Sequence, residues 1–327
     1  MKPILTVTNL SRDFIKTLDI VAKVLNQLGQ DYKEEIVHAV DDVSFEVYKG
    51  EIVGVVGESG CGKSTLGRMV AGILPPSKGT VKFDSSQSTL DTIPDELRTQ
   101  MIFQDPFSSL NPRKRVIDII TEAPIYHKLI NQKEKKDFAI KMLTGVGLDP
   151  EAMERYPHQF SGGQRQRIGI ARALAVSPEF LVCDESIAAL DVSIQAQILN
   201  LFVDLKTQYD LTYLFISHDI GVIEHVSDRV IVMYLGRIVE TAPIEDFLKR
   251  PSHPYTKALL DGVPRLEVGK RNYEPISGEI PSPLEPPTGC HFHPRCKFAT
   301  PRCKIEKPAL LEIAPQHFSA CHLNDET

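Results

Sequence analysis

The sequence has no stretch long and apolar enough to cross a bilayer. A transmembrane helix needs roughly 20 consecutive apolar residues, and the most apolar segments here, LTYLFIS and RVIVMYL, have only the length of a strand. The amino-terminal stretch MKPILTVTNLSRDF becomes polar too early for the core of a signal peptide. We therefore expect a soluble chain that stays in the cytoplasm.

The sequence also lacks an excess of positive charge. Its 37 basic and 43 acidic side chains give a formal net charge of −6 over 327 residues. A general nucleic-acid binder is expected to show a basic excess or a basic stripe, so this balance argues against nucleic acid as a partner. Internal repeats and low-complexity tracts are lacking as well. The length favours a main domain with one or two smaller appendages.

Cysteine is scarce, with six residues in the chain. In a cytoplasmic protein, cysteines are reduced thiols or metal ligands more often than disulfides. The composition shifts at about Arg250, after which proline interrupts the sequence repeatedly (PSHPY, GVPRL, GEIPSPLEPP). Such a run indicates an extended tether rather than a regular element. It leads to a cluster of cysteines, so we expect a small cysteine-rich module at the end of the chain.

Alternating apolar and polar residues predict strands over 3–14 and 36–56, with Lys49-Gly50 as a turn. Residues 15–35 indicate an inserted amphipathic helix, which either covers part of its own domain or forms a docking surface. The apolar side chains at helical spacing in this insertion are Leu18, Val21, Leu25 and Leu28.

Later segments alternate between helical and strand character. From about residue 106 a charged stretch is expected to be mostly helical, and the apolar runs FLVCDE and YLFISH then flank a further helical segment. Such alternation is typical of a parallel sheet with crossover helices. The sequence therefore predicts an α/β fold. We expect a main domain over 1–250, a helical subdomain at about 106–175 within it, and an extension over 251–327.

The stretch GESGCGKS, from Gly57 to Ser64, matches the phosphate-binding pattern G-x-x-x-x-G-K-[ST] between a predicted strand and a predicted helix. Its glycines let the backbone wrap around a phosphate, while N–H groups and the positive helix end face it. Lys63 adds a charge between the β- and γ-phosphates, and the Ser64 hydroxyl ligates Mg²⁺. The predicted loop for ATP and Mg²⁺ consists of Gly57, Glu58, Ser59, Gly60, Cys61, Gly62, Lys63, Ser64 and Thr65.

The run FLVCDE supplies the second half of such a site. A strand that ends in Asp184 places a carboxylate at the carboxyl edge of the sheet, where open α/β sheets bind ligands. We expect Asp184 to hold Mg²⁺ through water. Glu185 points differently and is the candidate that orients or deprotonates the attacking water. Together with the glycine-rich loop, these carboxylates indicate an ATPase.

A second turn suited to phosphate opens the helix after FSGGQ. The helix dipole and its first N–H groups suit a γ-phosphate, and the Ser161 hydroxyl is a further donor. The turn consists of Ser161, Gly162, Gly163 and Gln164. The order of loop, Gln104, this turn, the Asp-Glu pair, Asp191 and His218 resembles that of the ATP-binding cassette (ABC) superfamily. The resemblance implies a P-loop ATPase with a mixed RecA-like sheet core and an antiparallel β region.

In the superfamily that this chain resembles, two cassettes pair head to tail. The resemblance therefore implies that the turn at 161–164 caps a nucleotide held by the P-loop of a partner cassette. Gln104 looks like the residue that senses Mg²⁺ and the attacking water. It would act with Ser64 and Asp184 around the metal ion.

Three further roles follow from the resemblance. His218 looks like the residue that contacts the γ-phosphate, and Asp191 resembles the one that signals across the dimer. Phe14 is similar in position to the aromatic residue that stacks on adenine. The chain departs from the family beside Glu185, because Ser186 stands where a proline is usual and alanines occupy 188–189. We expect hydrolysis to survive, although a degenerate cassette that barely hydrolyses ATP is an alternative.

Longer phrases narrow the resemblance. QDPFSSLNPR, ALDVSIQAQ, SHPY and GEIPSPLEPPTGCHFHPRC look like the ATP-binding subunits of oligopeptide and dipeptide importers. The implied partners are a homologous cassette, which makes a heterodimer, two membrane-spanning permeases that contact Gln104 and 106–127, and an external peptide-binding protein. The implied location is the cytoplasmic face of the cell membrane. Nickel importers share these sequence motifs, so nickel stays open as the cargo. A soluble cassette ATPase that acts on ribosomes or DNA is an alternative function of another class.

This tail resembles that of relatives that bind a 4Fe-4S cluster, and such a cluster takes four thiolates. The four candidates are Cys290, Cys296, Cys303 and Cys321, spaced C-x5-C-x6-C-x17-C. Structural zinc prefers tighter pairs, although His291, His293 and His322 offer substitute ligands. Zinc and surplus reduced thiols therefore stay open beside the cluster.

Overall fold

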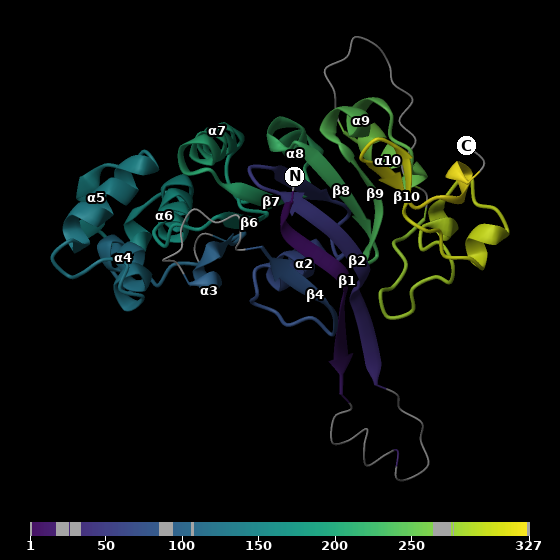
Figure 1. Cartoon of the computed structure of the whole chain (residues 1–327), viewed down its shortest axis with the longest axis horizontal. Helices are drawn as coiled ribbons and strands as arrows, with labels where there is room; N and C mark the ends of the chain where they lie inside the picture. Colours follow the sequence, from purple (N-terminus) through teal and green to yellow (C-terminus); the bar gives the residue numbers. More distant parts are fainter. Residues whose placement is uncertain are drawn as a thin grey trace.

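Two β-sheets form the framework of the chain (Figure 1). The structure is a computed structural model, and it describes residues 2–17, 26, 34–84, 94–105, 108–263, 276 and 278–325. The larger sheet has the strand order β10 (Leu311–Ala314), β11 (His317–Ser319), β9 (Arg237–Pro243), β8 (Arg229–Tyr234), β3 (Ile52–Val56), β7 (Thr212–Ile216), β6 (Phe180–Asp184) and β5 (Thr99–Ile102). The smaller sheet has the order β2 (Glu35–Tyr48), β1 (Pro3–Lys16) and β4 (Lys78–Phe83).

The larger sheet is mixed, and the smaller one is antiparallel. β3 pairs in parallel with β7 and β8, and β6 pairs in parallel with β5 and β7. β9 runs antiparallel to β8 and β11, and β1 runs antiparallel to β2 and β4. The predicted mixed sheet core with an antiparallel β region is confirmed.

The central strands are buried on both faces, which explains their nearly continuous apolar sequences. Ile52 and Val56 of β3 pack into one core, and Val53 and Val55 pack into the other. α2 (Lys63–Val70) lies between the two sheets, where its Leu66 shares a core with strands of both. The opposite face is covered by α7 (Val192–Tyr209), α8 (Ile220–Val226), α9 (Ile244–Lys249) and α10 (Pro254–Asp261).

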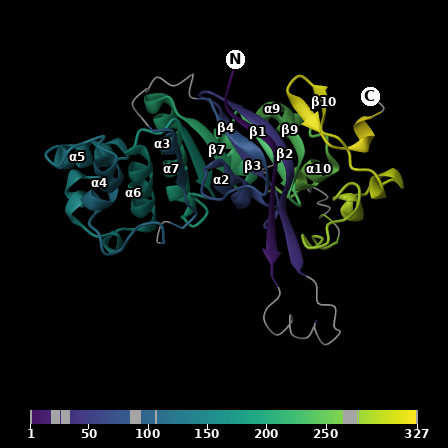
Figure 2. The same ribbon diagram turned by 60° about the horizontal axis from the view of Figure 1, so that its bottom comes forward.

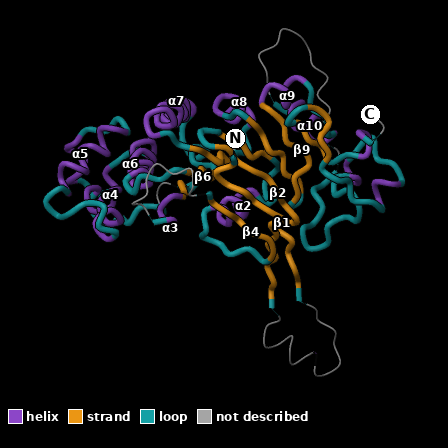
Figure 3. Tube along the Cα trace, viewed as in Figure 1, coloured by secondary structure: helices purple, strands orange, loops and turns teal. Residues whose placement is uncertain are grey.

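A group of helices lies at one end of the molecule. α4 (Val116–Tyr126), α5 (Lys135–Gly145) and α6 (Gly162–Leu174) follow β5 and precede β6, while the short α3 (Asp95–Arg98) leads into β5. All three ribbon and tube views place this group at the end opposite the carboxyl-terminal segment (Figures 1, 2 and 3). The 3₁₀ turns η2 (Pro150–Glu154) and η3 (Pro157–Gln159) connect α5 to α6.

The carboxyl-terminal part is more regular than its proline content predicts. The expected tether is wrong over its first residues, because Pro254 starts α10, and proline is well suited to the first turn of a helix, where no N–H partner is needed. β11 then adds to the main sheet by pairing with β9. The buried Glu240 of β9 fixes both segments, because its carboxylate accepts from the N–H groups of Ser252 and His253 at 2.8 Å and lies 2.7 Å from His317 Nε2.

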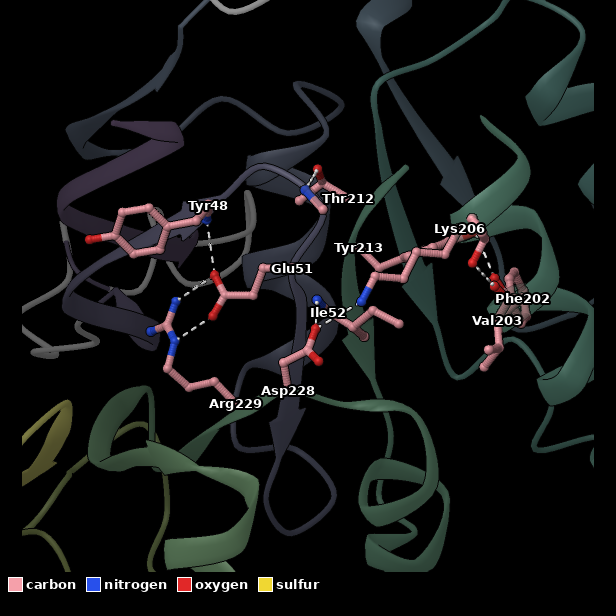
Figure 4. A network of polar contacts seen from close by, with 12 residues as sticks. Tyr48, Glu51, Ile52, Phe202, Val203, Lys206, Thr212, Tyr213, Asp228 and Arg229 are labelled. Carbon is pink, nitrogen blue, oxygen red and sulfur yellow. Dashed lines mark hydrogen bonds and ion pairs between the residues drawn. The ribbon is translucent and has the colours of Figure 1, made fainter. Parts of the chain in front are cut away.

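A polar network joins the amino-terminal ends of the central strands (Figure 4). Arg229 donates to both carboxylate oxygens of Glu51, at 2.7 and 3.0 Å. Asp228 accepts from the N–H group of Ile52 at 2.8 Å and from Lys206 Nζ at 2.9 Å. These bonds fix the edge of the sheet at which the central strands begin. The carboxyl ends of the same strands lie at the opposite edge, where the glycine-rich loop begins.

The amphipathic helix expected over 15–35 falls mostly outside the described residues. Within them, Ile15, Lys16 and Glu35 belong to β1 and β2, so the prediction is wrong at its margins. Among the helices that the structure describes, none is both long and apolar enough to cross a membrane.

Candidate functional site

The glycine-rich loop leaves the carboxyl end of β3 and enters α2 at Lys63. The Lys63 side chain is buried, and its Nζ donates to the carbonyl oxygens of Gly57 at 2.7 Å and Glu58 at 2.9 Å. No side chain in the described part of the chain caps α2, so the first N–H groups of the helix remain available to an anion. The loop thus presents a buried ammonium group and a helix amino terminus to the same space.

Strand β2 passes close to the loop. Gly62 has φ 102°, and a Cβ there would lie 2.1 Å from the carbonyl oxygen of Ala39, so only glycine fits this approach. Phe14, the predicted adenine-stacking residue, pairs with Val37, two residues before Ala39. Its ring is 39% exposed, and the Arg12 guanidinium lies 4.8 Å from the ring centroid. Phe14 is therefore an exposed ring on the ribbon that borders the loop.

Ser64 and Asp184 meet at the carboxyl edge of the sheet. The Ser64 hydroxyl donates to Asp184 Oδ1 at 2.8 Å. Asp184 is 3% exposed, and burial raises the pKa of its carboxyl, while the bond from Ser64 and the charge of Arg68 lower it. Mg²⁺ prefers oxygen ligands and takes one or two carboxylates together with substrate phosphates. The predicted Ser64–Asp184 pair fits that ion, because a divalent cation would relieve the buried carboxylate.

Glu185 follows β6 and lies between two other predicted residues. Gln104 Nε2 donates to Glu185 Oε2 at 2.6 Å, and His218 Nδ1 lies 3.2 Å from Glu185 Oε1. Glu185 has φ 44°, a backbone conformation that costs a non-glycine residue on the order of 1–3 kcal/mol and that is concentrated at functional sites. The N–H group of Glu185 donates to Ile216 O at 2.9 Å, which fixes this conformation beside the end of β7.

The second predicted phosphate turn caps its own helix. Ser161 Oγ accepts from Gln164 N at 3.4 Å, and Gln164 Oε1 accepts from Ser161 N at 3.1 Å, which forms a capping box at the start of α6. A Cβ at Gly163 would lie 2.5 Å from Ile194 Cγ2, so the turn packs closely against the first turn of α7. Asp191 is the exposed N-cap of α7.

The turn that starts α6 is separate from the P-loop within one chain. Figures 1 and 2 both show α6 among the end helices, with α2 nearer the middle of the molecule. The structure therefore brings Lys63, Ser64, Asp184 and Glu185 to one sheet edge, whereas Ser161 caps α6, which belongs to the group of end helices.

Four cysteines line one cavity of about 290 Å³, namely Cys290, Cys296, Cys303 and Cys321. Burial raises the pKa of Cys290 to about 11, and it also raises the pKa of Cys296 and of Cys321. Within the described ranges, no three His, Cys, Asp or Glu side chains are placed to hold a single metal ion.

The histidines that could substitute as zinc ligands have other partners. His291 Nδ1 lies 3.2 Å from Leu235 O, and His293 Nδ1 lies 2.9 Å from Cys290 O. Both ring nitrogens of His322 are within hydrogen-bonding distance of Asp325 or of the Glu306 carbonyl oxygen. His322 therefore has no ring nitrogen left for zinc, whereas the Nδ1 contacts of His291 and His293 leave their Nε2 atoms available, as in many metal-ligating histidines.

Two residues beside the P-loop were missed by the sequence reasoning. Tyr255, from SHPY, accepts from the N–H group of Glu58 at 2.8 Å, and Arg295, from HPRC, forms an ion pair with the Glu58 carboxylate. Both phrases stood out in the sequence. No spacing rule connects them to a loop so far along the chain.

Comparison with known proteins identifies the family. A family model described as ABC transporter matches residues 40–188, and one described as oligopeptide/dipeptide transporter, C-terminal region, matches residues 239–303. The chain is 50% identical over 295 residues to the oligopeptide transport ATP-binding protein AppF of Bacillus subtilis, covering 88% of this chain and 90% of that one. The chain belongs to the ABC transporter family. As an ABC ATPase, it uses ATP with Mg²⁺.

Other relatives agree with this family. The putative oligopeptide transport ATP-binding protein YkfD of Bacillus subtilis is 48% identical over 306 residues, covering 90% of this chain and 93% of that one. The solved ABC structures include the dimeric post-hydrolysis state of the ATP-binding cassette MJ0796 bound to ADP and Pi. It matches with a TM-score of 0.60 and 25% identity, covering 73% of this chain and 98% of that one. The predicted ABC cassette fold is thereby confirmed.

Proposed function

We propose that this ABC ATPase is the ATP-hydrolysing subunit of an importer for oligopeptides or dipeptides, located at the cytoplasmic face of the cell membrane. The observation that carries the ATPase is the convergence of Lys63, the Ser64–Asp184 pair and Glu185 on one sheet edge. The peptide cargo is supported by the names of the relatives and by the matched carboxyl-terminal region.

Each residue has a role that its contacts support. Lys63 and the first turn of α2 would bind the phosphates, and Ser64 and Asp184 would hold Mg²⁺, which supplies charge neutralisation when bound. Glu185 would orient or deprotonate the attacking water, because its carboxylate is already positioned by Gln104 and His218.

The remaining half of the nucleotide pocket would come from a partner. We assign residues 161–164 and Asp191 to the nucleotide held by a homologous cassette, arranged head to tail as a heterodimer. Two membrane-spanning permeases and an external peptide-binding protein would complete the importer. In this division 1–250 form the cassette, 106–175 form its helical subdomain and 251–327 form the extension. The group of α4 to α6 at one end of the molecule supports the subdomain.

We further propose that the four-cysteine cavity holds a 4Fe-4S cluster. Each cysteine of such a cluster binds a different iron, so the thiols surround a cavity rather than a single point, as they do here. Iron and zinc should be measured after anaerobic purification, alongside a Cys303→Ser variant. Iron with matching sulfide that is lost in the variant would support the cluster, and a sample without iron would contradict it.

The transport proposal is tested by reconstitution. The chain is expected to co-purify with two permeases and a second cassette, and ATP hydrolysis in vesicles is expected to rise when a loaded peptide-binding protein is added. Stimulation by a nickel-binding protein instead would contradict the peptide cargo but leave the ATPase intact. Assembly with no membrane protein at all would contradict an importer.

A further inference from the structure

Glu58 is a P-loop residue whose three polar groups are all engaged. Its carbonyl oxygen accepts from Lys63 Nζ at 2.9 Å and from Cys61 N at 3.3 Å. Its N–H group donates to the Tyr255 hydroxyl at 2.8 Å, and its carboxylate binds Arg295. Two of these three attachments therefore come from chain beyond residue 250, outside the proposed cassette.

The contact between Arg295 and Glu58 has a well-defined geometry. Its two terminal nitrogens donate to the two Glu58 oxygens at 2.6 and 2.9 Å, a bidentate geometry that fixes orientation as well as distance. The Arg295 side chain is 5% exposed. Its guanidinium lies 5.9 Å from the ring centroid of Tyr234, and the Tyr234 ring packs against Tyr255 and Phe292. The Arg295 side of the ion pair is thus buried against an aromatic cluster, while the Glu58 side chain is 22% exposed.

Contacts from other segments help to fix the shape of the P-loop. Gly57, Gly60 and Gly62 all have positive φ values, and glycines in these regions are ordered only at a large cost in backbone entropy. The bonds within the loop, from Lys63 to Gly57 and Glu58, offset part of that cost. Contacts that fix Glu58 reduce the ordering that a nucleotide would otherwise have to impose.

The contact from Arg295 to Glu58 comes from the segment that lines the cysteine cavity. Arg295 ends the 3₁₀ turn η4 (His293–Arg295) and directly precedes Cys296. Cys290, Phe292 and Cys296 all line the cysteine cavity, while Phe292 also contacts Tyr255 on its other side. Arg295 therefore links the wall of the cysteine cavity directly to the P-loop.

We propose that Arg295 is a positioning residue of the nucleotide site, which holds the P-loop in its binding shape through Glu58 and makes the cysteine-lined segment part of that site. The inference rests on the proposed ATP function. It predicts that Arg295 acts on nucleotide affinity more than on the chemical step, because Asp184 ends β6 and Glu185 follows it, outside the P-loop that Arg295 contacts.

The test measures the Kd for a fluorescent ATP analogue with Mg²⁺, and kcat and KM for ATP, in the full chain. Arg295→Met is expected to raise Kd and KM about tenfold, equivalent to a single lost ionic contact of modest strength, with kcat within about twofold. Glu58→Gln keeps the backbone bonds and is expected to weaken binding less. The double variant should bind no more weakly than Arg295→Met, since both remove one interaction.

Arg302→Met is the matched control. Arg302 lies in the same segment and forms ion pairs with Glu306 and Asp325, so its loss disturbs the segment without touching the P-loop, and Kd should not change. Unchanged Kd in both Arg295→Met and Glu58→Gln overturns the proposal, as does equal weakening in the control. If Arg295→Met does not fold, Glu58→Gln decides. A parent protein that binds no ATP would refute the proposed function itself.

Discussion

Lys63 illustrates how a single buried charge prepares a phosphate site. Its ammonium group is held by two neutral carbonyl oxygens of the loop, of Gly57 and Glu58. An arriving phosphate would therefore gain a charge-assisted bond at little cost in reorganisation. We expect Lys63→Ala to weaken ATP binding about 100-fold, on the order of 3 kcal/mol, as measured by equilibrium titration. ATP turnover at the parental rate would refute the P-loop assignment.

A substitution at Glu185 is expected to affect the hydrolysis step rather than ATP binding. Its carboxylate is positioned by Gln104 and His218 rather than by the P-loop, so removing its charge should leave the phosphate contacts intact. Glu185→Gln is expected to keep ATP affinity within about threefold and to lower kcat by about 100- to 1,000-fold, as general-base catalysis of this kind contributes. Single-turnover hydrolysis measures the step directly. A variant as fast as the parent would mean that another group activates the water.

The residues that could be predicted from the sequence are those whose chemistry is local. The loop at 57–65 and the Asp-Glu pair follow from a motif and from the end of a strand. Gln104 and His218 were placed by family resemblance alone, and the structure brings both to Glu185. Arg295 and Tyr255 were missed because they reach Glu58 across 237 and 197 positions of sequence. No periodicity carries that information.

At the scale of elements, burial explains which predictions succeeded. β6 and β7 are buried at every position, so their sequences are mostly apolar runs, and such runs can be recognised from the sequence alone. α10 was missed because Pro254, its first residue, and Pro251 just before it were interpreted as breakers. The helix exists because Pro254 occupies its first turn and His253 caps it, a matter of position rather than of composition.

The cap of α10 makes the stability of the fold depend on pH. His253 is 1% exposed, its Nδ1 accepts from Tyr255 N at 3.0 Å, and burial lowers the pKa of His253 to about 4. Between about pH 4 and pH 6.5 the unfolded chain binds the proton and the folded chain does not, whereas below about pH 4 both bind it. The free energy of unfolding should therefore rise as pH increases from about 4 to 6.5, with His253 contributing on the order of 1–3 kcal/mol.

His253→Asn provides the matched comparison for this pH dependence, because asparagine also caps helices but does not titrate. Urea unfolding at pH 5 and pH 7 should show a smaller difference between the two pH values for the variant than for the parent. Some dependence should remain, since burial also lowers the pKa of His291 to about 4. An identical pH dependence in variant and parent would show that the pKa of His253 is the same in the folded and the unfolded chain.

At the scale of the whole molecule, the fold separates the two turns of the chain that are proposed to bind phosphate. The P-loop lies at the carboxyl edge of the central strands, whereas α6 and its opening turn belong to the group of helices at one end (Figure 1). Since α6 and its opening turn lie apart from α2 and the P-loop, we infer that this turn serves a nucleotide held by another molecule. This separation is the structural support for a head-to-tail pair of cassettes.

The pair is tested by placing a charge in that turn. In a mixed dimer of one Ser161→Arg chain and one unmodified partner cassette, the arginine should block the pocket that contains the partner's P-loop and leave the other pocket intact. A photoreactive ATP analogue is expected to label this chain at the parental level and the partner at least about tenfold less, because a bulky side chain would occupy the γ-phosphate position.

Ser161→Ala is the control, since Ser161 also caps α6, and loss of the cap alone costs about 1 kcal/mol of stability. If the cap alone mattered, alanine and arginine would reduce labelling equally, and on both chains. Loss of labelling on the mutated chain rather than on its partner would place the turn over its own P-loop. That result would contradict the pair, because each chain would then hold a complete nucleotide pocket.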